Sequence, residues 1–411
     1  MRLYVLEIKR LLKTRSVGLL IIAALVLSAV LSYLPVTYIQ AYKTDKSGDI
    51  QIVTGIEAIK AKKADKKALH GEMTEAKIRE TIADVKEVLK EYGSLDRQNI
   101  PLEVYVEKVY PHLDIIGVLE QTIVPNGKSL YTLEYSDINE DDAENVYAAY
   151  KKTVGNLNKN PEVQKKINQM TRSIQMPFVY YPEISMDQLD YYEIYLFLVM
   201  IFFMVIITPV FAAEYQTGAD QILRCTKHGR LRLALTKIAV TFTLVVAVFV
   251  TGTTIFSIVM RVLYGAEPFK NPLQMLGYLY YIPAFTVGKM YKFMAVGALF
   301  SLMAVAASTL FFSAKCKNVQ SALISAFVTA FVPMVIYTIS NGRNIFEILR
   351  CIFPTSGLAF MNSLEQELLA RHFVKIGSGY YWTPYVIMIA AVICIPVFLI
   401  VTVVSYCKRE A

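Results

Sequence analysis

Residues Glu214 to Lys237 read EYQTGADQILRCTKHGRLRLALTK, a short charged segment between two long apolar stretches. Each flanking stretch holds about 20 apolar residues, enough at about 1.5 Å per residue to cross a hydrocarbon core of about 30 Å. The segment itself is too polar to enter that core. We therefore expect two membrane-spanning helices joined by a loop at the membrane surface.

The composition of the whole chain also indicates a membrane protein. Of 411 residues, 55% are hydrophobic and only 18% are charged, which is too apolar for an ordinary soluble protein. The sequence predicts an α-helical polytopic membrane protein with six transmembrane helices. The predicted spans are 17–39, 191–213, 238–263, 289–314, 319–339 and 383–406. The first is too long for a removable signal peptide and lacks a small-residue cleavage site, so we expect it to be retained.

Lysine and arginine in the short loops set the predicted orientation. They gather in residues 1–16, in 214–237, in the turn 315–318 and in the tail 407–411. Both termini are therefore expected in the cytoplasm. The net charge of +8 is attributed to this topology rather than to nucleic-acid binding. The segments expected on the outer side are 40–190, 264–288 and 340–382.

Segment 40–190 is long enough to form an extracytoplasmic domain, which we expect to be mostly α, with α+β as the alternative. Residues 72–92 carry apolar side chains at helical spacing, and Asn160-Pro161 is a typical helix start before a second such stretch. Further expected elements are a helix over 141–157 and short strands over 104–110 and 129–135. None of the five cysteines lies in this domain, so no disulfide framework is predicted, which favours a single-membrane bacterium.

The predicted spans hold no ionisable residue in their middle, and charges such as Glu193 are expected at the interfaces. A charge in the bilayer centre costs at least about 2.5–3.5 kcal/mol and is kept where a proton or ion is carried, so a proton- or sodium-coupled carrier is not expected. Gly127-Lys128-Ser129 resembles part of a phosphate loop, but that motif needs a glycine where this chain has Thr122. The four histidines are scattered, so no metal site is expected. Without a nucleotide-binding motif or a set of nucleophile, base and metal, we expect no enzyme activity and no bound cofactor in this chain.

The segment 214–237 resembles the loop between the second and third helices of ABC-2 type permeases, the membrane subunits of ATP-binding cassette transporters. That loop carries an acidic residue, then glycine, leucine, a basic residue and a lysine at the next helix. The matching positions are Glu214, Gly218, Leu223, Arg230 and Lys237. Residues 1–16 resemble the family's amphipathic helix before the first span. The layout of spans, outer domain and broken segment before the last span is similar too, whereas Cys225 to His228 depart from the small and proline residues common in the family's loop.

The resemblance implies that ATP and Mg²⁺ bind to separate cytosolic ATPase subunits. A short helix in the loop would sit on each ATPase and transmit its closing motion to the spans. Tyr215, Ala219, Ile222 and Leu223 would share one face of that helix; an ordinary solvated loop is the alternative. The residues expected to couple the two subunits are Glu214, Tyr215, Gly218, Ile222, Leu223, Arg224, Lys227, Arg230 and Lys237.

Three other groups of residues are candidates for a role. Pro354 and Gly357 interrupt an apolar stretch that is too short to cross, which the family resemblance identifies as a re-entrant segment within 340–382. A small-residue stripe on the fourth span favours close packing, either within the bundle or between two copies. It consists of Gly297, Ser301, Ala304 and Ser308. Tyrosines near the outer membrane surface predict an aromatic belt or, alternatively, a lateral gate. They are Tyr180, Tyr181, Tyr191, Tyr192 and Tyr195.

The expected function is that of the permease subunit of an ATP-driven exporter in the cytoplasmic membrane of a bacterium. Its substrate would be an amphiphile, namely a hydrophobic peptide, a lipid or an antibiotic, because the spans offer an uncharged path. The expected partners are ABC ATPase subunits, a second copy or a related permease, and membrane lipid. The alternative is a membrane sensor or scaffold whose outer domain binds an antimicrobial peptide or another ligand without transport.

Overall fold

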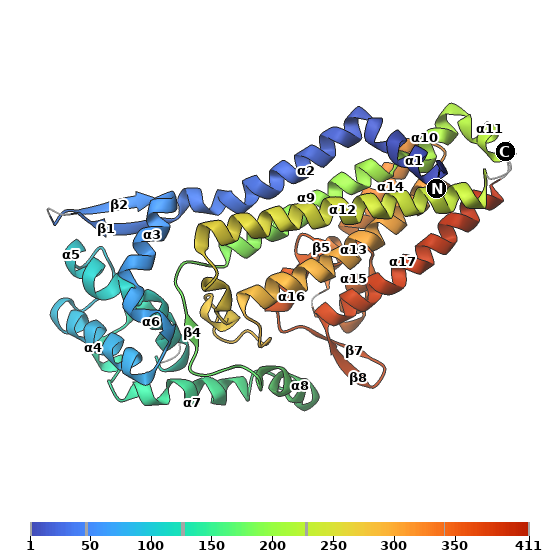
Figure 1. Ribbon diagram of the computed structural model, residues 1–411. Coiled ribbons are helices and arrows are strands. Elements are labelled where there is room, and N and C mark those ends of the chain that lie inside the picture. Colours follow the sequence, from blue (N-terminus) through green and yellow to red (C-terminus); the bar gives the residue numbers. More distant parts are fainter. Residues whose placement is uncertain (1, 46–47, 125–127, 227–228, 341, 410–411) are drawn as a thin grey trace. The chain divides into compact units, whose positions relative to one another are not determined.

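The computed structural model describes residues 2–45, 48–124, 128–226, 229–340 and 342–409. Within these residues the chain is mostly helical, with four small two-stranded sheets (Figure 1). It divides into two compact units. Unit 1 consists of Met1–Ser32, Leu189–Val259 and Lys292–Ala411, and unit 2 consists of Tyr33–Gln188 and Met260–Tyr291.

Six helices among the described residues are long and apolar enough to cross a membrane, which is the pattern of a multi-pass membrane protein. This confirms the predicted number of spans. They are α2 (Arg15–Tyr33) with η1 (Leu34–Tyr38), α9 (Asp187–Ile207) with α10 (Pro209–Thr217), α12 (Leu231–Tyr264), α13 (Val287–Lys315), α14 (Val319–Ile339) and α17 (Thr383–Lys408). A separate helix, α1 (Arg2–Lys13), precedes the first span.

Three of these helices expose a long apolar stripe. On α14 the exposed side chains recur every three or four residues, which is the spacing of one helix face. They are Ile324, Val328, Phe331, Val335 and Ile339. The corresponding residues are Leu19, Ile22, Val26, Val30 and Tyr33 on α2, and Ile389, Val392, Val397, Ile400 and Val404 on α17. Lipid tails or the apolar face of another helix would cover such stripes.

The second span is broken between α9 and α10. Pro209 has no N–H group and its ring clashes with the carbonyl of the preceding turn, so the helix cannot continue unchanged. Ser313 of α13 binds the backbone at this point. Its hydroxyl donates to the carbonyl of Thr208 at 2.6 Å and accepts from the amides of Phe211 at 2.9 Å and Ala212 at 3.1 Å. One side chain from a distant part of the sequence thereby satisfies three backbone groups at the break.

The chain between α14 and α17 folds into short elements. They are α15 (Asn344–Ile352), β5 (Leu358–Ala359), β6 (Asn362–Ser363), α16 (Leu364–Leu369), β7 (Phe373–Ile376) and β8 (Gly379–Trp382), with β5 antiparallel to β6 and β7 antiparallel to β8. Pro354 and Gly357 lie buried in the turn between α15 and β5. Gly357 has φ +89°, and a Cβ there would lie 3.0 Å from Ser301 and Ile387. The predicted re-entrant segment is therefore packed tightly on α13 and α17.

Unit 2 is built mainly from the chain between the first two spans. Its elements are β1 (Gln40–Thr44), β2 (Ile50–Thr54), α3 (Gly55–Asp65), η2 (Lys67–Leu69), β3 (Gly71–Glu72), α4 (Glu75–Tyr92), α5 (Leu102–Val104), η3 (Tyr105–Val109), η4 (Tyr110–His112), α6 (Leu113–Thr122), η5 (Leu130–Thr132), η6 (Tyr135–Asp137), α7 (Asp142–Val154), α8 (Pro161–Thr171), β4 (Val179–Tyr180), η7 (Pro268–Lys270) and η8 (Leu273–Met275). The antiparallel pairs are β1 with β2 and β3 with β4.

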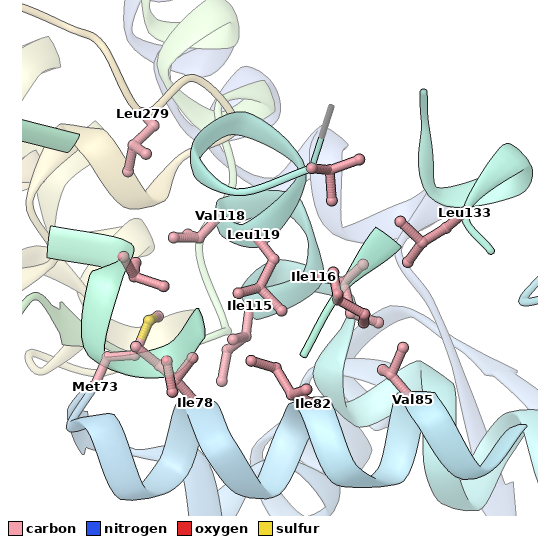
Figure 2. Close-up of a cluster of buried hydrophobic side chains, with 14 of the residues drawn as sticks. Met73, Ile78, Ile82, Val85, Ile115, Ile116, Val118, Leu119, Leu133 and Leu279 are labelled. Carbon is pink, nitrogen blue, oxygen red and sulfur yellow. The ribbon is translucent and has the colours of Figure 1, made fainter. Parts of the chain in front are cut away.

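A hydrophobic core holds unit 2 together (Figure 2). Helix α4 contributes Ile78, Ile82 and Val85, which lie on one helix face, and α6 contributes Leu119. Leu279, from the chain between α12 and α13, also joins this core. Residues 264–288, expected as a separate loop, therefore belong to the same domain as the chain before α9.

Two of the three predicted helices of this unit begin at a capping residue whose side chain binds the first amides of the helix. The predicted helix 72–92 is α4, which begins after the N-cap residue Thr74 and ends at Gly93, whose φ is +67°. The Asn160 side chain accepts from the amides of Glu162 at 3.0 Å and Val163 at 3.4 Å, and so caps α8. Both predictions are confirmed, and α7 matches the third.

The two predicted strands are wrong. Residues 104–110 lie in the consecutive helical turns α5, η3 and η4, and 129–135 contain the turns η5 and η6. Tyr105 and Val109 are one helical turn apart and both contact the core of unit 2. This packing outweighs the β propensity of valine and tyrosine, which depends strongly on context. A hydrogen-bonded capping box between Ser129 and Thr132 favours the turn in the second case.

Candidate functional site

The segment 214–237 forms a sharp bend between two short helices. Helix α10 ends at Thr217, and α11 (Ala219–Cys225) follows Gly218 directly. We name residues 209–225 the elbow. Gly218 has φ +73°, a conformation that glycine adopts without strain, and its amide donates to the carbonyl of Tyr215 at 3.3 Å. A Cβ at this position would meet no atom within 4 Å, so the backbone conformation rather than crowding favours glycine here.

The bend changes the predicted helix face. Tyr215 lies in α10, whereas Ile222 and Leu223 lie beyond Gly218 in α11, so the prediction that these side chains share one face is wrong. Within α11 the polar side chains Asp220 and Arg224 are buried, while Ile222 is 76% exposed. The charged side chains of α11 therefore face the protein, and the apolar side chain of Ile222 faces outward.

A buried charge cluster anchors the elbow to α1 and α12. Lys237 of α12 is 1% exposed, forms an ion pair with Glu214, and donates to the carbonyl of Val210 at 2.9 Å. Arg10 of α1 forms a 2.6 Å ion pair with the other carboxylate oxygen of Glu214 and a 2.8 Å ion pair with Glu7. The two acids and two bases neutralise one another, as burial of charge requires.

Two arginines link the elbow to the ends of α17 and α13. Arg224 is buried and donates to the carbonyl of Tyr406 at 2.8 Å, near the end of α17. Arg409 follows α17, lies 3.7 Å from the centre of the Tyr215 ring, and donates to the carbonyl of Ala314 at 3.2 Å, at the end of α13. The last carbonyls of a helix lack partners within the helix and attract positive charge. These contacts tie the elbow to both helix ends.

A cleft of about 910 Å³ opens beside the elbow between α1, α11 and α12. Arg224, Arg230 and Arg232 line it, together with Tyr4, whose hydroxyl donates to Thr243 at 2.7 Å. The cleft is therefore basic. Arg230 is one of the predicted coupling residues, whereas Lys227, another of them, lies outside the described residues.

The predicted small-residue stripe contacts other parts of unit 1. Gly297 packs against Leu364, and the space there does not admit a Cβ. Ser301 donates to the carbonyl of Ser356 at 2.9 Å. Ala304 and Ser308 are buried, and the Ser308 hydroxyl donates to the carbonyl of Val305 within its own helix. These contacts favour packing within the bundle over the alternative of a seam between two copies.

The five predicted tyrosines are divided between the two units. Tyr180 and Tyr181 belong to unit 2, and Tyr191, Tyr192 and Tyr195 belong to unit 1. The rings of Tyr192 and Tyr195 are buried, stacked with centroids 6.2 Å apart, and Tyr192 contacts Phe256 of α12. Tyr180 is buried and donates a hydrogen bond to Asp114. The side chains of Tyr180, Tyr192 and Tyr195 therefore lie inside their own units, whereas Tyr181 and Tyr191 are half-buried.

Sequence reasoning missed a second buried charge cluster, between α15 and α16. Arg350 is 0% exposed and binds both oxygens of Glu367, at 2.6 and 3.3 Å. It also pairs with Glu347 at 2.5 Å and donates to Asn362 at 2.6 Å. Although burial opposes the charge of Arg350, Glu367 raises its pKa. The hydrogen bond to Glu367 raises the pKa of His372. The signal in the sequence was Glu347 three residues before Arg350 in an otherwise apolar helix.

No family model matches this chain, and neither does any curated protein or solved structure.

Proposed function

We propose that this chain is the membrane-spanning permease subunit of an ATP-driven exporter. A separate cytosolic ATPase subunit, which binds ATP and Mg²⁺, docks on the elbow. The exporter moves an amphiphile, such as a hydrophobic peptide, a lipid or an antibiotic, across the cytoplasmic membrane of a bacterium. One observation carries this proposal: a single short bend is bonded to α1, α12, α13 and α17 at once.

The bonds of the elbow give a route for motion. A partner that pushes on α11 displaces Arg224, and with it the end of α17. The same push, carried through the bend at Gly218, moves Glu214 and therefore α1 and α12, to which Glu214 is paired. Rigid displacement of packed helices by a moving partner is a common mechanism of conformational change. With both termini in the cytoplasm, the elbow faces the cytosolic partner.

The exposed surface of the elbow and of the residues that follow it suits a partner with an apolar groove and an acidic rim. Ile222 provides an apolar anchor on the outer face of α11. Arg230 and Arg232 come after the elbow in the sequence, are exposed and line the basic cleft. Apolar anchors at the centre of an interface with complementary charges around them are typical of protein recognition.

The exposed apolar stripes of the spans support the proposal of two further partners, membrane lipid and a second permease. Those on α2, α14 and α17 are available to membrane lipid and to a second permease, either another copy of this chain or a related one. We propose no nucleic-acid partner, because Arg224 is bound to the end of α17 and the proposed ATPase contact accounts for Arg230 and Arg232.

The test is affinity purification of the tagged chain from native membranes, with ATPase activity measured on the recovered material. Ile222→Glu places a charge on a side chain that is 76% exposed, so the fold is retained, and we expect at least a tenfold loss of co-purifying ATPase. Tyr131→Glu is the matched control, because Tyr131 is 67% exposed in unit 2, and it should retain the ATPase. Recovery of the wild-type chain without ATPase, or equal recovery with both variants, would refute the proposal and favour the sensor or scaffold.

A further inference from the structure

Two glutamates of unit 1 bring their carboxyl groups together in buried surroundings. Glu193 lies in the first half of α9 and is 5% exposed, and Glu365 lies in α16 and is 0% exposed. The two carboxyl groups are within hydrogen-bonding reach of each other. Glu193 was expected to be an interfacial charge, but the structure buries it against a second acid.

Glu365 accepts no hydrogen bond from an N–H or O–H group of the described residues. Both of its oxygens are buried without a partner among the residues that the structure describes. The charged groups that act on it are Glu193 and Asp190, which are both acidic. Glu367, on the same helix, faces Arg350 instead. Two neighbouring helices add no nearby cation, because α17 carries no charged residue before Lys408 at its far end, and Lys292 of α13 is exposed.

This arrangement cannot hold two ionised carboxylates. A buried ionised group without a donor or an opposite charge is strongly unfavourable, and two carboxylates that share a site do not both ionise at neutral pH. A positive charge must therefore lie between them. A divalent metal ion needs several ligands, and the described residues contain no group of three or more acidic, histidine or cysteine side chains that could hold one. A proton needs only the two carboxyl groups.

We propose that Glu193 and Glu365 form a proton-binding site, in which one proton bridges the two carboxyl groups and holds α16 against α9. In the bound state one carboxylic acid donates its O–H to the other carboxylate, and the pair carries a single negative charge. Release of that proton to solvent leaves two carboxylates and a charge of −2 with no donor, so the contact opens. The site would make the position of the segment between α14 and α17 depend on pH, whether or not the chain is an exporter.

The pH dependence has a defined sign. Burial, together with Glu193 and Asp190, raises the pKa of Glu365 well above its ordinary value of 4.5. When the pKa of a group is higher in the folded state than in the unfolded state, its contribution to stability is complete at pH values below the unfolded pKa. That contribution is lost as pH rises through the folded pKa. The site therefore predicts a melting temperature that falls toward alkaline pH.

The experiment uses the full-length protein in detergent micelles, with two readouts. Infrared difference spectroscopy detects a protonated carboxyl group, and thermal unfolding gives the melting temperature as a function of pH. For the wild type we expect the protonated-carboxyl band at neutral pH and an alkaline decline in melting temperature. Glu365→Gln, which replaces the acid by a neutral hydrogen-bond donor, should remove the band and flatten the decline. Glu367→Gln is the matched control and should leave the band in place. It removes the part of the decline that comes from the Glu367–His372 contact, whereas the part that comes from Glu365 should remain.

Three results would overturn the proposal. The first is a wild-type spectrum with no protonated carboxyl at neutral pH, and the second is a band that persists in Glu365→Gln. The third is an alkaline decline whose midpoint shifts with sodium or potassium concentration, since that would identify a metal cation in place of the proton. If Glu365→Gln does not fold, Glu193→Gln provides the second comparison: the band must then change frequency, because its hydrogen-bond partner has changed, and an unchanged band refutes the site.

Discussion

Replacing Lys237 by methionine isolates the buried half of the charge cluster at the elbow. Methionine has a similar length and is apolar, so the change removes the ammonium group and leaves most of the side-chain volume. Glu214 loses its ion pair with Lys237, and the carbonyl of Val210 loses a 2.9 Å hydrogen bond. Among the described residues, Arg10 alone, whose side chain is 42% exposed, still pairs with Glu214.

The structure predicts very different costs for the two cations of this cluster. Removing one partner of a buried ion pair leaves a buried charge and typically costs about 3–5 kcal/mol. Because Lys237 is 1% exposed, Lys237→Met should lie in this range, lowered toward about 3 kcal/mol by the Arg10 contact. Arg10→Ala removes a pair that is partly open to solvent, so it should cost no more than about 1 kcal/mol.

The assay is unfolding of the purified protein in mixed detergent micelles, with a double-mutant cycle. Glu214→Gln combined with Lys237→Met removes both buried charges, so the double variant should be more stable than the sum of the single losses predicts, by about 1–3 kcal/mol. A loss for Lys237→Met that is no larger than that for Arg10→Ala would contradict the buried ion pair. So would losses at Glu214 and Lys237 that simply add.

Three further predictions use the same unfolding assay. Ser313→Ala removes the partner of one carbonyl and two amides at the break of the second span. It should lower the free energy of unfolding by about 2–3 kcal/mol. A loss no larger than that of an ordinary surface substitution would contradict this prediction. Gly218→Ala should cost about 1–2 kcal/mol from its positive φ alone. Gly357→Ala should cost more, because atoms also lie 3.0 Å from the new Cβ. A larger loss for Gly218→Ala would be contrary to the structure. The hydrogen bond to Glu367 raises the pKa of His372 above 6.5. His372→Gln should therefore lower the free energy of unfolding by up to about 1 kcal/mol below pH 6.5, and should not change it above the raised pKa. A loss of stability that does not depend on pH would speak against this contact.

Local sequence signals predicted the parts of the fold that depend on neighbouring residues. The apolar runs gave the six spans, because a helix that crosses a membrane needs only length and low polarity. Asn160 and Pro161 marked the start of α8, since the capping side chain binds amides two and three residues away. Gly218 was singled out by the family resemblance, and the structure gives its physical reason as a left-handed turn.

The features that sequence reasoning missed depend on residues far apart in the chain. Ser313 binds a backbone carbonyl 105 residues before it, and nothing near either residue indicates the pairing. Glu193 and Glu365 are likewise brought together only by the folding of the bundle. The outward position of Ile222 was missed for another reason: Arg224 is buried because it binds the end of α17, so tertiary contacts reverse the face that amphipathicity alone would select.

The serine at the broken span also bears on how the protein is made. Thr208 leaves the ribosome 105 residues before Ser313, an interval of about 5–20 s at ordinary rates of synthesis. During that time the carbonyl and the two amides at the break lack the hydroxyl that satisfies them, and unpaired backbone groups are not tolerated in contact with lipid. The second span is therefore expected to wait in a protected, partly hydrated position until α13 arrives, so that the second to fourth spans complete their insertion together.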